Sequence, residues 1–399
     1  MQTTEAHRKL AEKFMFKKLW KNVFVSEALV QLAALAYTEE EAEIVNALGL
    51  TGLPALAIAR RVKRPVREVA PILKSLAERF LIADYEVKGI KLYAFMQLIP
   101  GVYEMQMIRS RGKDDEFFKE FARLFSEYYE ETMRWLKPQV EKKDLRFGRV
   151  IPIEKSLESV SHLNIIALST DKYSEMVDRN KSFCLVDRCA CRQEAIYIGE
   201  GCGKPLDVCS AMGWMADLAV EKGLARRVTK EEFLDAKMRA AEAGLVNMVD
   251  NLQDPLQVCS CCGCCCSGLK MLSKFNIPTI IAQSHFEAFV NQDNCKGCKT
   301  CVEFCPMKAV TVKKKRARVE YSRCIGCGVC VTKCKEKAIA LKERPNHKPP
   351  AETGVEYILN RYFEIKEYEN PLLPRLSLGV GRLISKYVPI HISGPKYNP

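Results

Sequence analysis

The chain has 399 residues, 48% of them hydrophobic and 28% charged, a balance that excludes wholesale disorder and predicts two to four domains. The longest charge-free apolar stretch near the N-terminus, Ala28 to Thr38, is far shorter than the roughly 20 residues that cross a bilayer, and the first residues lack the apolar core of a signal peptide. We therefore expect a cytoplasmic protein without a transmembrane segment.

The first part of the chain is predicted to be helical. Residues 1–37 read as one or two helices, and Thr38 is a plausible N-cap for the acidic segment that follows it. Two further short helices precede a pair of β-prone runs around Lys88-Gly89, which predict a hairpin. In layout, residues 38–98 resemble a winged helix-turn-helix, although this class has no diagnostic motif.

Six basic residues lie in or beside the helix that would be the recognition helix of such a domain, namely Arg60, Arg61, Lys63, Arg64, Arg67 and Lys74. This placement suits phosphate contacts with DNA. The same helix carries Glu68 and Glu78 and few residues suited to reading bases. Because winged helices also dock proteins, DNA binding is the less favoured interpretation.

Residues 114–136 predict a long amphipathic helix with a broad apolar and aromatic face. The face comprises Phe117, Phe118, Phe121, Leu124, Phe125, Tyr128 and Met133. We expect it to be a packing face or a dimer contact. Downstream, the sequence predicts a helix at 172–177, a buried strand at 183–186 and helices over 211–250, with Thr229 and Glu232 as a capping box. The tail from Pro345 includes a helix-like stretch and an apolar, basic end.

Nineteen cysteines, all between Cys184 and Cys334, are the most unusual feature of the composition. In a reducing cytoplasm such a density indicates metal or redox chemistry rather than structural disulfides. Segment 293–312 repeats as segment 322–341, and each copy contains a C-x2-C-x2-C-x3-C run. Zinc also accepts C-x2-C pairs, but eight cysteines in this doubled spacing favour iron–sulfur clusters.

The doubled run resembles bacterial-type dicluster ferredoxins, in which the fourth cysteine of each run serves the other cluster. The resemblance implies two [4Fe–4S] clusters. Cluster I would be held by Cys295, Cys298, Cys301 and Cys334, and cluster II by Cys324, Cys327, Cys330 and Cys305. The second run departs from the family pattern at Lys335, where the first has Pro306. Such clusters relay electrons and leave no iron position open for a substrate.

The ferredoxin-like segment is strongly basic, with 14 Lys or Arg against 5 Asp or Glu over 293–345. This surface would favour a redox partner with an acidic docking face. The alternative is that the charges offset the clusters. A [4Fe–4S] cluster with four thiolates carries about two negative charges, so two clusters would lower the formal charge of +13 to about +9.

Ten more cysteines form a second region without zinc-finger spacing: Cys189, Cys191, Cys202, Cys209, Cys259, Cys261, Cys262, Cys264, Cys265 and Cys266. Adjacent cysteines point in different directions, so the run 259–266 can supply two neighbouring sites. We favour one or two additional [4Fe–4S] clusters here. Zinc or a mixed site, and reactive thiols, remain open. The only histidine near the cysteine regions, His285, is expected to be structural.

The middle region, with its segments CACRQEA, GCGKPLDVC and NLQDPLQVCSCCGCCC, resembles a poorly characterised group of iron–sulfur proteins from anaerobic microbes, which pairs it with a ferredoxin module and an N-terminal helical part. We expect an α+β, multidomain architecture. Its parts are a helical, winged-helix-like domain (1–110), a long helix and linker (111–150), an α/β cysteine-rich metal-binding domain (151–290), a dicluster ferredoxin domain (291–345) and a C-terminal extension (346–399). The expected function is electron transfer between partner oxidoreductases. The alternatives are a catalytic iron–sulfur reductase with a substrate-binding cluster in the middle domain, or a redox-sensing transcription regulator.

Overall fold

The computed structural model describes residues 2–15, 24–140, 145–160, 172–278, 281–345, 347–352, 354 and 356. The chain divides into two compact units. Unit 1 comprises Met1–Leu136, Ala190–Gly201 and Ser393–Pro399, and unit 2 comprises Lys137–Cys189 and Cys202–Ile392. The chain therefore leaves unit 2 for one short segment of unit 1 and returns, a crossing that the expected linear boundaries do not include.

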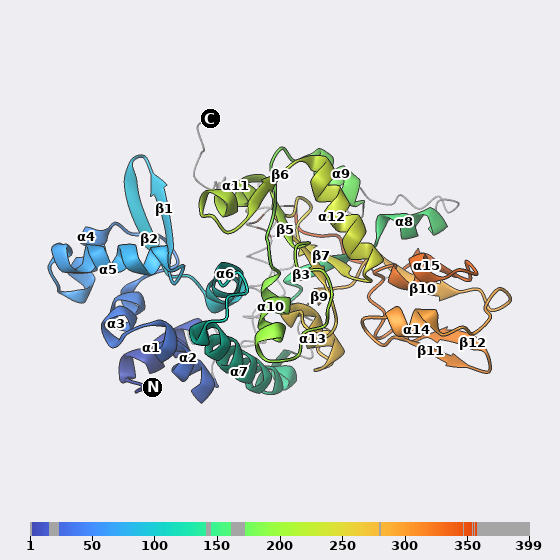
Figure 1. The fold of residues 1–399 in the computed structure, drawn as a ribbon, viewed down its shortest axis with the longest axis horizontal. Coiled ribbons are helices and arrows are strands. Elements are labelled where there is room, and N and C mark those ends of the chain that lie inside the picture. Colours follow the sequence, from blue (N-terminus) through green and yellow to red (C-terminus); the bar gives the residue numbers. More distant parts are fainter. Residues whose placement is uncertain are drawn as a thin grey trace, which may run out of the picture. The chain divides into compact units, whose positions relative to one another are not determined.

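Unit 1 is mainly helical (Figure 1). Its elements are α1 (Glu5–Phe14), α2 (Glu27–Ala36), α3 (Glu39–Ala47), α4 (Ala55–Val62), α5 (Val66–Glu78), β1 (Ala83–Val87), β2 (Ile90–Ala94), α6 (Tyr103–Arg109), α7 (Glu116–Val140, the last four residues of which fall in unit 2) and α10 (Ala190–Tyr197). Thr38 caps α3 with a complete capping box, as predicted. The hairpin is also confirmed, because Lys88 and Gly89 both adopt positive φ between the paired strands β1 and β2.

In residues 38–98, three helices precede the hairpin, and Leu53 pairs with Tyr93 of β2 in an isolated antiparallel bridge. The layout agrees with the expected order of elements. The winged-helix interpretation itself stays a prediction. The expected apolar positions Phe16, Leu19 and Trp20 lie outside the described residues.

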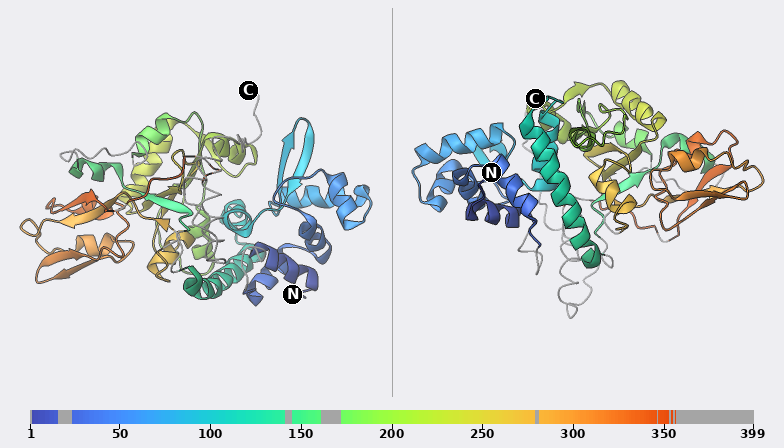
Figure 2. Two further views of the ribbon diagram at one scale, coloured as in Figure 1. Left: turned by 180° about the vertical axis from the view of Figure 1, so that it is seen from behind. Right: turned by 60° about the horizontal axis from the view of Figure 1, so that its bottom comes forward.

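The long helix α7, shown in teal in Figure 2, buries its apolar face. Phe118, Phe121, Leu124, Phe125, Tyr128 and Met133 are all buried, and Phe117 is half-buried. The ring of Phe125 stacks on Tyr103 of α6 with 3.7 Å between centroids. This face is therefore occupied within the chain and is not free to form the dimer contact that was the alternative.

Unit 2 is built on a seven-stranded sheet with the order β6-β4-β5-β8-β7-β3-β9. Its strands are β3 (Gly148–Ile151), β4 (Phe183–Leu185), β5 (Ser210–Met212), β6 (Arg226–Val228), β7 (Val246–Asp250), β8 (Gln257–Cys261) and β9 (Ile281–Ala282). All neighbours are antiparallel except β3 and β9. The helices of this part are α8 (Glu154–Leu157), α9 (Tyr173–Asp178), α11 (Gly213–Glu221), α12 (Lys230–Glu242) and α13 (Ser267–Ser273).

The expectation of helices over 211–250 was wrong at two short segments. The helices α11 and α12 are present, and Thr229 with Glu232 forms the predicted capping box of α12. However, β6 lies between the two helices and β7 follows them. Gly244, at φ +71°, follows the end of α12, and the run from Val246 is buried between β3 and β8. The tertiary sheet thus overrides the helical pattern at these two short segments.

The ferredoxin-like segment follows the sheet and carries two small sheets and two short helices (orange in Figures 1 and 2). Strand β10 (Phe286–Val290) pairs with β13 (Ile339–Glu343), and β11 (Val310–Lys313) pairs with β12 (Arg316–Val319). The helices are α14 (Thr300–Phe304) and α15 (Val329–Lys333).

The sequence repeat is also a backbone repeat. Gly297 and Gly326, at equivalent positions, have φ of +70° and +69°, and Lys299 and Gly328 have φ of +68° and +76°. These left-handed residues bend each loop within its cysteine run, and glycine adopts such a φ without a steric penalty. The same bend therefore recurs in both ligand loops.

Within the described ranges, no helix combines the length and the apolarity that a membrane crossing requires. The helix-like stretch expected in the tail falls almost entirely outside the described residues.

Candidate metal centres

The four cysteines predicted to hold cluster I lie close together. Burial, followed by the nearby thiols of Cys298, Cys295 and Cys334, raises the pKa of Cys301 to about 11. Neighbouring thiols have this effect because each disfavours a second negative charge beside it. Of these thiols Cys298 is exposed, and hydrogen bonding to Thr300 lowers its pKa. The group thus reaches the surface at Cys298.

The four cysteines predicted to hold cluster II line one cavity. Its walls include Cys305, Cys324, Cys327 and Cys330, with Ile325, Gly326 and Val329 between them and Pro306 beside Cys305. Burial and the neighbouring thiols raise the pKa of Cys327 and of Cys330. Cys305 comes from the first cysteine run and the other three come from the second. The structure therefore brings the predicted sets together across the repeat.

Backbone N–H groups point at the sulfur atoms. Ala309 N donates to Cys305 Sγ at 3.2 Å, and Ala338 N donates to Cys334 Sγ at 3.3 Å, at equivalent positions of the repeat. Ala317 N donates to Cys295 Sγ at 3.3 Å. Such donors stabilise thiolates and tune the potential of a bound cluster, so these thiols are prepared for an anionic, ligated state.

The loop that carries Cys324 and Cys327 accepts hydrogen bonds from other parts of unit 2. Ile153 N donates to Cys327 O at 3.0 Å, and Arg344 Nη2 donates to Cys324 O at 2.8 Å. The glycines of this loop allow close backbone packing: a Cβ on Gly326 would lie 1.8 Å from Phe286 O, and one on Gly328 would lie 2.0 Å from Ser156 Oγ. Any side chain at either position would displace the loop.

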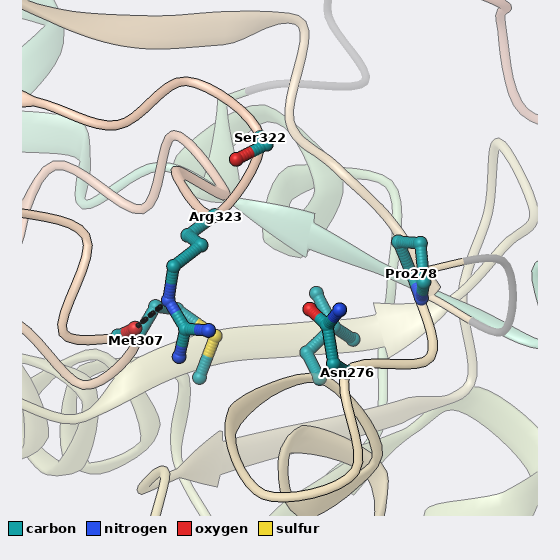
Figure 3. Close-up of a pocket in the computed structure, with 6 residues that line it drawn as sticks. Asn276, Pro278, Met307, Ser322 and Arg323 are labelled. Carbon is teal, nitrogen blue, oxygen red and sulfur yellow. Dashed lines mark hydrogen bonds between the residues drawn. The ribbon is translucent and has the colours of Figure 1, made fainter.

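Arg323, directly before Cys324, joins the ferredoxin-like segment to the end of α13 (Figure 3). Its Nε donates to Met307 O at 3.0 Å, and its Nη2 lies 3.5 Å from Ser273 O. Figure 3 shows Asn276 and Pro278 on the opposite wall of the small cavity that Arg323 lines. This arginine positions the chain as it enters the second cysteine run.

The comparison with protein families agrees with these sites. Residues 287–335 match the family model of the 4Fe-4S dicluster domain. The chain is an iron–sulfur protein. No curated protein and no solved structure matches it. The iron–sulfur identity therefore rests on 49 residues near the C-terminus, and it carries with it a redox function.

A second group of four thiols lies in the middle region. The Sγ atoms of Cys202, Cys262, Cys264 and Cys265 are all within 4.8 Å of one another, and those of Cys264 and Cys265 are 3.7 Å apart. We call these residues the four-thiol group. A hydrogen bond with the Cys262 thiol raises the pKa of Cys264 to about 11, and the thiols of Cys262 and Cys264 raise the pKa of Cys265 further.

The remaining cysteines of the run 259–266 turn elsewhere. Cys266 Sγ lies 3.2 Å from Cys261 Sγ, and the thiol of Cys259 also contacts that of Cys261. Ser210 of β5 pairs with Val258 of β8 in antiparallel register. Continuing this register by one residue places Cys209 opposite Cys259 at the end of the pairing. Two pairs of adjacent cysteines diverge as predicted, because Cys261 and Cys266 contact each other while Cys262 and Cys265 belong to the four-thiol group. The adjacent Cys264 and Cys265 instead converge on the same group.

Two further predicted ligands, Cys189 and Cys191, come from other segments of the chain. Cys189 donates its N–H to Leu206 O at 2.8 Å, which holds it beside the segment that leads to Cys209. Cys191 lies in α10, which belongs to unit 1, where it contributes to raising the pKa of Glu104 and of the buried Tyr103. His285 hydrogen-bonds Glu343 at 2.8 Å and stacks on His347, in agreement with a structural role.

Lys237, a buried lysine of α12, was not identified from the sequence. Its Nζ donates to Val208 O at 2.7 Å, to Val258 O at 3.0 Å and to Ser260 Oγ at 3.2 Å. The first two carbonyls belong to the residues directly before Cys209 and Cys259. The buried ammonium group of Lys237 is therefore held by backbone carbonyls next to Cys209 and Cys259 in the sequence.

The basic residues of the winged-helix-like region are partly engaged within the chain. Arg64 Nη2 lies 2.6 Å from Glu40 Oε1 and 3.4 Å from Glu68 Oε2, and Lys74 Nζ lies 3.8 Å from Glu78 Oε1. Arg61 donates to Ala47 O at 3.2 Å. These contacts compete with phosphate contacts and do not strengthen the DNA-binding interpretation.

Proposed function

We propose that the protein carries single electrons between partner oxidoreductases, using two [4Fe–4S] clusters held by its ferredoxin-like segment. Cys295, Cys298, Cys301 and Cys334 would hold one cluster, and Cys305, Cys324, Cys327 and Cys330 the other. A bound [4Fe–4S] cluster accepts or releases one electron without forming or breaking a bond to substrate. The observation that carries the proposal is the presence of two sets of four cysteines in the ferredoxin-like segment. A cluster with four thiolate ligands has no open position for a substrate.

The two sets differ in exposure, which supports a direction for the transfer. Cys298 of the first set is exposed, whereas Cys324, Cys327 and Cys330 of the second are buried. The second loop also takes hydrogen bonds from Ile153 and Ser284 in the middle region. Electrons would exchange with an external partner at the first set, and the second set would connect inward to the cysteine-rich region.

The charges around the first set support an acidic partner. Lys296 and Lys299 lie in the loop between its ligands, Lys335 follows Cys334, and the carbonyl of Lys315 packs against Gly297. All four lysines are exposed. We call them the basic patch. Opposite charge on a partner would steer its encounter toward Cys298.

Anaerobic purification followed by iron and acid-labile sulfide assays tests the proposal. We expect at least eight irons and eight sulfides per chain, and EPR signals from two clusters that each take up one electron on reduction. Cys301→Ala and Cys327→Ala should each remove about four irons, whereas Cys184→Ala, a buried thiol outside every group described above, should remove none. Four or fewer irons in the unaltered protein would overturn it.

A second measurement separates a carrier from a catalyst. The reduced protein should pass its electrons to a redox protein and then stop, with one electron delivered per cluster. Continuous reduction of a small molecule by the protein alone, at enzymatic rates with dithionite as the electron source, would replace the carrier assignment with the catalytic alternative. In that case the cysteines of the middle region would be the place to seek the substrate.

A further inference from the structure

We propose that Cys202, Cys262, Cys264 and Cys265 bind one thiophilic divalent metal ion, zinc or iron, in a closed tetrahedral site separate from the ferredoxin clusters. This replaces, for these four residues, the expectation of an additional [4Fe–4S] cluster. It does not depend on the electron-carrier function.

The distances between the sulfur atoms carry the inference. In a tetrahedral site with metal–sulfur bonds of about 2.3 Å, neighbouring sulfurs stand about 3.8 Å apart. The four Sγ atoms here all lie within 4.8 Å of one another, and the Cys264–Cys265 pair is at 3.7 Å. Small side-chain adjustments would bring all four to one ion. Tetrahedral coordination by four sulfurs is typical of zinc and of iron.

The ferredoxin thiols provide an internal reference for a cubane. A [4Fe–4S] cluster places four irons and four sulfides between its thiolates, so its ligands must stand farther apart than those of one ion. Among the described residues, the four-thiol group is the one set of three or more Cys, His, Asp or Glu whose ligand atoms converge within 4.8 Å. The eight ferredoxin cysteines, all described, do not converge to this extent.

The local chain explains the tight spacing. Cys262, Cys264 and Cys265 occupy the turn between β8 and α13, and Cys266 N bonds to Cys262 O at 3.3 Å across it. Gly263 O accepts a hydrogen bond from Ser273 Oγ at 2.7 Å. The fourth thiol, Cys202, comes from a different segment, which Lys204 ties to the end of α12 by a hydrogen bond to Ala243 O at 2.9 Å. The site would thus cross-link two parts of unit 2.

The ion would also stabilise the packing against the ferredoxin-like segment. Gly263 lies so close to Pro306 that a Cβ on it would be 2.1 Å from the Pro306 carbonyl oxygen. Pro306 directly follows Cys305, a ligand of the buried set. With four protein ligands the site has no open position, which is the arrangement of structural rather than catalytic zinc sites. Cys264 is exposed and gives the ion access to the solvent.

The test is the metal and sulfide balance of the full-length, anaerobically purified protein and its variants. We expect one metal ion per chain beyond the ferredoxin iron, without accompanying labile sulfide. If the ion is zinc, X-ray absorption at the zinc edge should show four sulfurs at about 2.3 Å and no metal–metal contact. If it is iron, the balance of iron against labile sulfide should show one iron more than sulfide. Elemental analysis decides between zinc and iron. Cys264→Ser, at an exposed position, should reduce this ion to less than a tenth of an equivalent and leave the labile sulfide unchanged.

Two controls keep the test decisive. Cys184→Ser should retain the ion, because Cys184 belongs to neither thiol group. Cys262→Ser provides a second ligand variant, and circular dichroism shows whether each variant is folded. Loss of about four irons and four sulfides from Cys264→Ser would mean a cubane at this site and would overturn the proposal. Retention of all metal in both folded ligand variants would overturn it as well.

Discussion

The ferredoxin-like segment and the four-thiol group use the same side chain at different spacings, and the comparison shows what selects the cofactor. In the ferredoxin-like segment, each loop places three cysteines at every third residue, and the fourth comes from the other repeat. In the four-thiol group, three cysteines crowd into four consecutive residues. In the ferredoxin-like segment the thiols of Cys305, Cys324, Cys327 and Cys330 line a cavity, whereas the sulfurs of the four-thiol group lie within 4.8 Å of one another. Four thiols that stand farther apart favour a cluster, and four thiols close together favour a single ion. The distance between the thiols, rather than their number, makes the difference.

The largest expected effect concerns which thiols share a cluster. If the fourth cysteine of each run serves the other cluster, Cys305→Ser and Cys327→Ser should remove the same EPR signal. Cys334→Ser and Cys295→Ser should then remove the other signal, and each variant should lose about four irons. If Cys305→Ser instead reproduces the spectrum of Cys295→Ser, each run holds its own cluster. The assignment of Cys305 to the second ligand set would then be wrong.

The next prediction tests whether the contact between the four-thiol group and the ferredoxin-like segment stabilises the folded chain. Gly263→Ala places a methyl group 2.1 Å from a backbone oxygen of Pro306, so the loops must separate. We expect a loss of about 1–3 kcal/mol in the free energy of unfolding, as for other overpacked sites. The urea midpoint for loss of the visible absorbance of the clusters measures it. Gly49→Ala, whose new Cβ would meet nothing closer than 3.6 Å, is the control. Equal midpoints would show that the contact is not structural.

Much of the ferredoxin-like segment was predictable because its geometry is local. The C-x2-C-x2-C spacing within a dozen residues predicts the three ligands of each loop, and the resemblance to dicluster ferredoxins implies that the fourth comes from the other repeat. The helix caps at Thr38 and Thr229 are local for the same reason. The capping box needs only residues three positions apart.

The four-thiol group could not be predicted because one of its members is remote. Cys202 meets the run 262–265 only through the packing of the sheet, and sequence spacing carries no such distance. The buried charge of Lys237 is equally invisible, because an isolated lysine in an amphipathic helix reads as a solvent-exposed residue. The strands β6 and β7 were missed because such short segments fit helix and strand equally well without the neighbouring strands, and β6 begins with two exposed arginines.

The third prediction concerns how the stability of unit 1 depends on pH. Burial raises the pKa of Glu104 in α6 to about 8, while Gly101 N donates to its Oε2 at 2.7 Å. The folded chain keeps this proton up to about pH 8, whereas the unfolded chain loses it near 4.5. Stability from this group is therefore present at low pH and is lost as the pH rises through that window. The slope approaches about 1.4 kcal/mol per pH unit.

Glu104→Gln should remove this slope, because the amide oxygen still accepts the Gly101 hydrogen bond without a charge. Denaturant unfolding between pH 6 and 8, followed by circular dichroism under anaerobic conditions, measures it. The exposed residue Glu116, replaced by Gln, is the control. An unchanged slope in Glu104→Gln would show that the pH dependence originates elsewhere, for example in the thiols of unit 2.

The smallest expected effect concerns the surface at which the first thiol set exchanges electrons. Lys296→Glu with Lys299→Glu reverses two charges of the basic patch beside the exposed Cys298. Oxidation of the reduced protein by ferricyanide, an anion, should slow several-fold at low ionic strength, and oxidation by a cationic cobalt complex should quicken. Both changes should shrink as salt screens the charges. Lys181→Glu, an exposed lysine of the middle region, should alter neither rate. If the charge reversal affects the two oxidants equally, electrons leave at another surface, and the more buried second set becomes the candidate for contact with the partner.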